Sequence, residues 1–161
     1  MLVIVWHSRT GACEAMAKAA YAGAGGALGG AARLLRASDV AVQDLLAADG
    51  FLFCCPENLG AMSGEMKEMF DRTYYDLLGH VEGRPYASII AAGSAGQGAQ
   101  AQLDRIVTGW RLRRIAEPIC VNFNAQTAQD IWAPKRVPKE SLFICEELGS
   151  AMSEGIGAGI F

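Results

Sequence analysis

The sequence lacks several features that would place the protein outside the ordinary globular class. It has no basic N-terminal region and no leader-cleavage site, and its first apolar run, residues 1–5, is too short to cross a membrane. With a net charge of −3 it also lacks the basic excess typical of non-specific nucleic-acid binding. We therefore expect a cytoplasmic protein with no membrane insertion and no nucleic-acid partner.

The five cysteines lack C-x-x-C and metal-ligand spacings, so we assign no disulfide and no metal. Cys54, Cys55 and Cys120 lie within apolar runs, where a cysteine is usually a small buried hydrophobe. With 161 residues, 52% of them hydrophobic and 19% charged, the chain has the balance of one folded domain with a substantial core. We expect residues 1–161 to form that single domain.

One stretch organises the N-terminal part of the chain. The apolar, β-branched residues 1–5 predict a buried strand, and the alanine-rich residues 15–22 favour a helix. Between them Ser8 and Thr10 supply hydroxyls, and Gly11 permits a tight turn with uncovered N–H groups. With the positive end of the helix dipole, these groups predict a phosphate site. The alternative is an ordinary strand-to-helix connection in which Thr10 only caps the helix.

Further apolar runs predict strands over residues 51–55, 86–92 and 118–121, and residues 31–36 form a modest candidate at or near a sheet edge. We expect Pro56 to stop its strand, so that residues 56–62 form a loop and residues 93–98 a flexible one.

Helical spacing of apolar residues predicts the helices between these strands. Ser38 and Asp39 are expected to cap a short one, and Ser63 is the expected N-cap of another. Trp110 falls on the apolar side of its helix and is read as core. The last helix carries residues 142–156, and the glycine-rich residues 155–159 are expected to fray.

Strand and helix alternate about five times, and the strands are almost continuously apolar. This pattern predicts a three-layer, doubly wound α/β fold with a five-stranded parallel sheet in the order 2-1-3-4-5. Such sheets bind ligands at the carboxyl ends of strands, at the point where the strand order reverses. The loops 8–13, 56–63 and 93–98 follow the first, third and fourth strands, so in this order they converge.

Two segments resemble a known family. Ser8-Arg9-Thr10-Gly11-Ala12-Cys13 is similar to the flavodoxin phosphate loop, Ser/Thr-x-Thr-Gly-x-Thr. Residues 56–71 (PENLGAMSGEMKEMFD) resemble the segment that wraps the flavin ring in WrbA-type NAD(P)H:quinone oxidoreductases, and Gly83-Arg84-Pro85 resembles the Gly-Lys-Pro before that family's fourth strand. The resemblance covers most of residues 1–121 and identifies the chain as similar to flavodoxin-like FMN-binding proteins.

The resemblance implies where FMN is held. The phosphate contacts are Ser8, Arg9, Thr10, Gly11, Ala12 and Cys13; the ring segment contains Pro56, Glu57, Asn58, Leu59, Gly60, Ala61 and Met62; and Gly93, Ser94, Gly96 and Gln97 approach the pyrimidine side. There are departures: Cys13 replaces a hydroxyl, and Asn58 and Leu59 replace the usual arginine and aromatic. The chain also lacks the WrbA-type insertion after the fourth strand, so tetramer formation and that family's nicotinamide contacts do not carry over.

Three functions remain open. Loops 56–63 and 93–98 contain no aromatic residue, unlike those of electron-carrying flavodoxins, and a ring open on one face could receive a nicotinamide or a quinone. We therefore favour an NAD(P)H-dependent oxidoreductase that reduces quinones or similar small acceptors by two-electron transfer, with the flavin itself as the reactive group and no catalytic side chain. A flavodoxin-type electron carrier served by a partner reductase is the first alternative. The second is a receiver-like or partner-binding domain, although His7-Ser8 and Cys54-Cys55 stand where a phospho-receiver needs acidic residues.

Residues 122–137 show no periodic pattern and are longer than most connections in a compact domain. Our hypothesis is that Trp132 covers a flavin, in its own subunit or across a homodimer; the alternative is that it only pins the segment to the body. We read His7 as a structural histidine, and Tyr74 and Tyr75 as packing residues.

Overall fold

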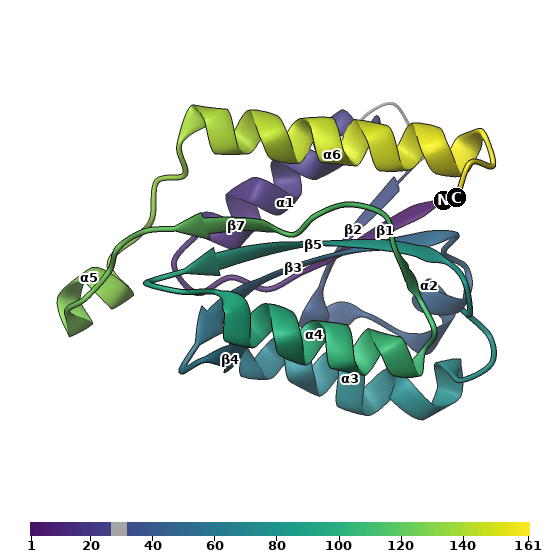
Figure 1. The fold of residues 1–161 in the computed structure, drawn as a ribbon, viewed down its shortest axis with the longest axis horizontal. Helices are drawn as coiled ribbons and strands as arrows, with labels where there is room; N and C mark the ends of the chain where they lie inside the picture. The colour runs from purple at the N-terminus through teal and green to yellow at the C-terminus, as the bar shows by residue number, and fades with distance from the viewer. Residues whose placement is uncertain (27–31) are drawn as a thin grey trace.

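A computed structural model describes residues 1–26 and 32–161, and Figure 1 shows its arrangement in space. The strands are β1 (Leu2–Trp6), β2 (Ala32–Arg36), β3 (Gly50–Asn58), β4 (Ala61–Met62), β5 (Pro85–Ala92), β6 (Arg113–Arg114) and β7 (Ile119–Asn122). The helices are α1 (Ala12–Gly23), α2 (Val42–Leu46), α3 (Gly64–Leu77), α4 (Gln97–Gly109), α5 (Ala128–Trp132) and α6 (Lys139–Gly157), with a single 3-10 turn at Ala37–Asp39 before α2. Across the described ranges 1–26 and 32–161, no helix is long and apolar enough to span a membrane.

The parallel sheet has the order β2-β1-β3-β5, and the fifth position beside β5 is shared by two short strands. β6 pairs with the start of β5, whereas β7 pairs with its last four residues, Ile89 to Ala92. This confirms the predicted order 2-1-3-4-5, with β2 at the edge. Because β1, β3 and β5 are neighbours and parallel, their carboxyl ends lie side by side.

Helices cover both faces of the sheet, α1 and α6 on one side and α2, α3 and α4 on the other (Figure 1). Successive strand residues serve the two sides in turn: Val3 and Phe53 pack toward α3 and α4, and Ile4 and Leu52 toward α1 and α6. Every residue of β1 and β5 is buried, as the near-continuous apolar runs predict. Trp110 is also fully buried, which confirms its place in the core.

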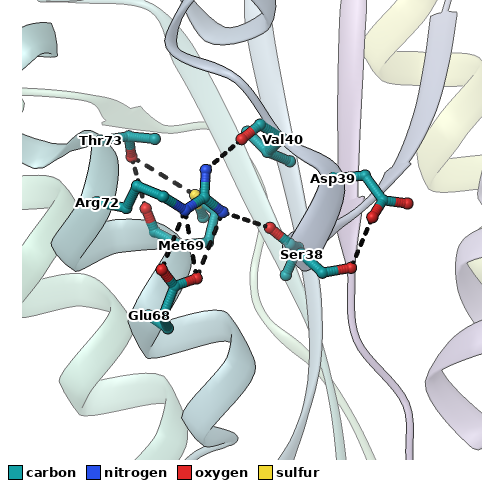
Figure 2. Close-up of polar contacts among 8 residues, drawn as sticks. Ser38, Asp39, Val40, Glu68, Met69, Arg72 and Thr73 are labelled. Atoms are coloured by element: carbon teal, nitrogen blue, oxygen red, sulfur yellow. Dashed lines mark hydrogen bonds and ion pairs between the residues drawn. The ribbon is translucent and has the colours of Figure 1, made fainter.

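Arg72 on α3 fastens the 3-10 turn to the body of the protein (Figure 2). Its Nη2 donates to the carbonyl of Ala37 at 3.0 Å, its Nη1 donates to the carbonyl of Val40, and its Nε donates to Glu68 Oε1 at 3.0 Å. The expected cap at Ser38-Asp39 is therefore wrong, because those residues form this turn. The N-cap of α2 is Ala41, whose N–H donates to the Asp44 carboxylate at 2.8 Å.

Pro56 does not stop its strand, contrary to the sequence expectation. β3 continues to Asn58 and folds back as β4, with Asn58 paired antiparallel to Ala61. The two residues of the turn, Leu59 and Gly60, have φ values of 53° and 73°, which is the backbone of a type I′ hairpin turn. Proline lacks only the N–H, and its carbonyl still accepts from Ser63 N at 3.1 Å. The expected loop is thus a hairpin.

Three other expectations need correction. α6 runs to Gly157, and the predicted fraying fails because Gly155 is buried beneath the ring of Phe161. Gln97 and Gly98 belong to the first turn of α4 rather than to a loop. Cys120 is exposed, because β7 lies at the sheet edge, whereas Cys54 and Cys55 are buried as expected.

Candidate functional site

The turn from β1 to α1 has the backbone expected of an anion-binding loop. Gly11 is the N-cap of α1, with a left-handed φ of 91° that strains any residue with a side chain. Ser8 Oγ accepts from Gly11 N at 3.1 Å and so holds the turn from inside. The first N–H groups of α1 have no partners within the helix, as at any helix start. Thr10 is not the cap, so the alternative reading of this stretch is wrong on that point.

Cys13 cannot offer its side chain to a ligand at this loop. It is fully buried behind the first turn of α1, where its carbonyl accepts from Cys54 Sγ at 3.3 Å. Only its backbone N–H remains for a phosphate contact. The replacement of a hydroxyl by Cys13 therefore serves packing against β3.

A cavity of about 670 Å³ opens at the carboxyl ends of β1, β3 and β5, within the usual size range of small-molecule and cofactor sites. Predicted residues from all three loops line it: Arg9, Thr10, Ala12, Pro56, Glu57, Asn58, Leu59, Gly60, Met62, Gly93 and Ser94. The structure therefore brings the three predicted loops together around one space. Six predicted residues lie beside the cavity without lining it: Ser8, Gly11, Cys13, Ala61, Gly96 and Gln97.

Glu57 joins the hairpin to the start of α4. Its Oε1 accepts from Gly96 N and its Oε2 from Ala99 N, both at 2.9 Å. A Cβ on Gly98 would lie 2.0 Å from the carbonyl oxygen of Gly60, so the hairpin tip and α4 also touch directly. The Glu57 carboxylate therefore caps α4, which explains why Gly96 and Gln97 shape the helix start and do not face the cavity.

Asn58 places an unused hydrogen-bond donor at the cavity. Its Nδ2 is buried and has no acceptor among the described residues. A buried amide donor without a partner costs about 1–3 kcal/mol, so a ligand with acceptor atoms fits this wall. Leu59, at the hairpin tip, is fully exposed and presents an apolar side chain at the same opening.

The segment of residues 122–137 forms the remaining wall, which the loop analysis missed. Phe123, Ile131, Trp132 and Lys135 from this segment line the cavity. Figure 1 shows α5 standing away from the sheet and its helices, at the end where the cavity opens. The signal in the sequence is a long, aperiodic connection that carries large apolar residues.

This segment is tied to two of the loops. Ala125 N donates to Gly93 O, and Lys135 N donates to Thr10 O, each at 2.8 Å. The Arg9 guanidinium lies 5.7 Å from the centre of the Trp132 ring, within cation–π range. Trp132 is nonetheless 65% exposed, so most of its surface is free to meet a ligand at the cavity.

The other residues with chemical potential lie elsewhere. His7 Nε2 is 3.4 Å from Glu65 Oε1 outside the cavity lining, and its Nδ1 is buried without a partner in the described chain. Burial lowers the pKa of His7, against Glu65, which raises it. Tyr74 packs on Trp110, and Tyr75 is exposed outside the cavity lining.

Cys120 lies beside the loop 93–98, where its Sγ donates to Ala95 O at 3.4 Å. Burial, with the nearby Glu57 carboxylate, raises the pKa of this thiol.

Comparison with known proteins identifies what this chain is similar to. A family model described as NADPH-dependent FMN reductase matches residues 36–126. A flavodoxin of Aquifex aeolicus (strain VF5) is 30% identical over 107 residues, which are 66% of this chain and 58% of that protein. The chain thus aligns with little more than half of this relative's length.

Solved structures share the fold at low identity. An archaeal flavodoxin superimposes with a TM-score of 0.75 at 16% identity, covering 97% of this chain and 98% of that one. A WrbA-like flavodoxin from Agrobacterium tumefaciens gives a TM-score of 0.68 at 16% identity, covering 98% and 97%. At these identities the likeness is one of fold alone.

Proposed function

The chain belongs to the NADPH-dependent FMN reductase family, and on this premise we propose that it binds FMN in the cavity and uses NAD(P)H to reduce a small acceptor. The family match also agrees with the flavodoxin-like resemblance of residues 8–13 and 56–71. A quinone or similar small molecule is the acceptor we propose, reduced by two-electron transfer.

The convergence of three loops and the segment 122–137 around one 670 Å³ cavity is the observation that carries this proposal. The start of α1, turned open by Gly11, suits a phosphate. The buried Asn58 amide suits the carbonyl and ring-nitrogen acceptors of a flavin. Leu59 and Trp132 supply apolar surface for a flat ring.

Bound FMN would supply the hydride and two-electron chemistry itself. The chain would bind and orient it. Arg9 and the first turn of α1 would offset the phosphate charge, Glu57 would hold the hairpin and α4 in fixed relation, and Trp132 would shield the ring from water. No described side chain needs to transfer a proton in this scheme.

A flavodoxin-type electron carrier is the second candidate, and a specific observation favours it. The sequence argument for an open ring face rests on the absence of aromatics from two loops, whereas Phe123 and Trp132 reach the cavity from the segment 122–137. A covered ring would hinder hydride transfer from a nicotinamide while leaving electron transfer to a protein partner feasible.

The test is an anaerobic titration of the FMN-loaded protein with NADPH and, separately, NADH, followed in the visible spectrum. Complete bleaching in one two-electron step supports the reductase. No reaction with either nucleotide, together with long-wavelength absorbance during dithionite reduction, indicates the carrier. Failure of FMN to give a bound spectrum would contradict both and favour a partner-binding domain.

A further inference from the structure

Arg36 ends the edge strand β2 next to the loop that the proposed function assigns to a phosphate. It pairs in parallel register with Trp6, the last residue of β1. The carboxyl ends of neighbouring parallel strands open at one edge of a sheet. Arg36 therefore shares that edge with residues 8–11, on the side of β1 opposite to β3.

The guanidinium of Arg36 rests on an aromatic support. Its Cζ lies 4.7 Å from the centre of the Trp6 ring, and Trp6 is only 6% exposed. This contact holds the planar group while its N–H donors remain free, because Arg36 makes no ion pair or side-chain hydrogen bond with any described residue. Arg33, three residues earlier on the same strand, is instead paired with Asp44 at 2.5 Å.

The field of Arg36 reaches both ends of the loop. Burial lowers the pKa of His7, just before the loop, and the charges of Arg9 and Arg36 lower it further. The hydrogen bond from Lys18 lowers the pKa of Glu14, in the first turn of α1, and Arg36 adds to this effect. Arg36 is thus electrostatically close to the loop from the side that the cavity does not occupy.

We infer that Arg36 and Arg9 form the two cationic arms of a subsite for a phosphate monoester dianion, with the N–H groups at the start of α1 between them. An arginine fork donates paired hydrogen bonds to phosphate oxygens, and the helix start contributes further donors. Two sources carry this chemistry under the proposed function on which the inference rests. They are the phosphate of FMN and the 2′-phosphate of NADPH.

The test compares three variants with the parent protein. Arg36→Gln removes the charge, Arg36→Met removes it while keeping the apolar stem on Trp6, and Arg36→Lys keeps a charge without the fork. Arg113→Gln is the matched control, because Arg113 is also exposed, ends a strand and makes no ion pair among the described residues. Circular dichroism first establishes that each variant is folded.

The first measurement uses inorganic phosphate on the FMN-free protein, with chloride at equal ionic strength as the reference. Phosphate should raise the thermal midpoint of the parent and of Arg113→Gln. The rise should vanish in Arg36→Gln and Arg36→Met and return in part in Arg36→Lys. This readout does not depend on FMN, so it decides the subsite even if the proposed function fails.

The second measurement separates the two sources. A loss of about three- to tenfold in FMN affinity in Arg36→Gln, with riboflavin affinity unchanged, assigns the subsite to FMN. A rise of about the same size in KM for NADPH, with KM for NADH unchanged, assigns it to the nucleotide. If Arg36→Gln matches Arg113→Gln in phosphate stabilisation, FMN affinity and both KM values, the inference is wrong.

Discussion

Replacing Glu57 by glutamine tests how the hairpin and α4 are held together. The carboxylate accepts from Gly96 N and Ala99 N, both at 2.9 Å. A glutamine amide has one acceptor oxygen, so one of these N–H groups would face an NH₂ donor and lose its partner. An unpaired N–H costs about 1–3 kcal/mol, and the lost charge at the start of α4 adds about 0.3–1 kcal/mol. We expect Glu57→Gln to lower the free energy of unfolding by about 2 kcal/mol.

The assay is urea unfolding of the FMN-free protein, followed by circular dichroism and by tryptophan fluorescence. For a chain of this length the loss corresponds to a decrease of about 4–8 °C in Tm. Glu117→Gln is the control, because Glu117 is exposed and takes no part in a hydrogen bond or ion pair among the described residues. A Glu57→Gln protein as stable as this control would refute the reasoning. If it is destabilised as expected, FMN affinity should fall too, because the capped turn forms one wall of the cavity.

Three further predictions follow from the same geometry. Trp132→Ala should weaken FMN binding and increase the fluorescence of the bound flavin, with Trp132→Phe intermediate; unchanged affinity and fluorescence would remove the ring-covering role. Asn58→Ala should leave the FMN-free protein as stable as before or slightly more so, since an unpaired buried donor is lost, yet raise the Kd for FMN about tenfold, and equal affinities by calorimetry would contradict this. Burial raises the pKa of the Cys145 thiol to about 12, above the unfolded value near 8.5. The folded protein therefore retains this proton at higher pH, and unfolding free energies should decline as pH rises from about 8.5 toward 11. In native protein a thiol reagent should modify Cys120 promptly and the buried thiols only after denaturant is added, and prompt reaction of all five cysteines would show that the core is open.

The strands and their order could be predicted because the signals that specify them are local. The run 51–55 must be buried on both faces, and the segment 15–22 favours helix whatever surrounds it. Once alternation implies a doubly wound sheet, the convergence of loops 8–13, 56–63 and 93–98 follows from strand order alone. For this reason most residues that line the cavity were found from the sequence.

The misses all depend on contacts between residues distant in the chain. Pro56 continues its strand because Ser63 and Ala91 hold it there. Cys120 is exposed because its strand lies at the sheet edge.

By itself, the sequence determined the layered fold, the glycine turn that opens the start of α1, and the edge of the sheet at which a ligand binds. These follow from apolar periodicity and from the backbone freedom of Gly11, which are properties of short segments. Only the tertiary structure decided that Trp132 meets Arg9 at the cavity, that Glu57 caps α4, and that Arg36 rests on Trp6. Each of these contacts joins segments whose separation in space is set by how helices and strands pack, and no local pattern encodes that distance.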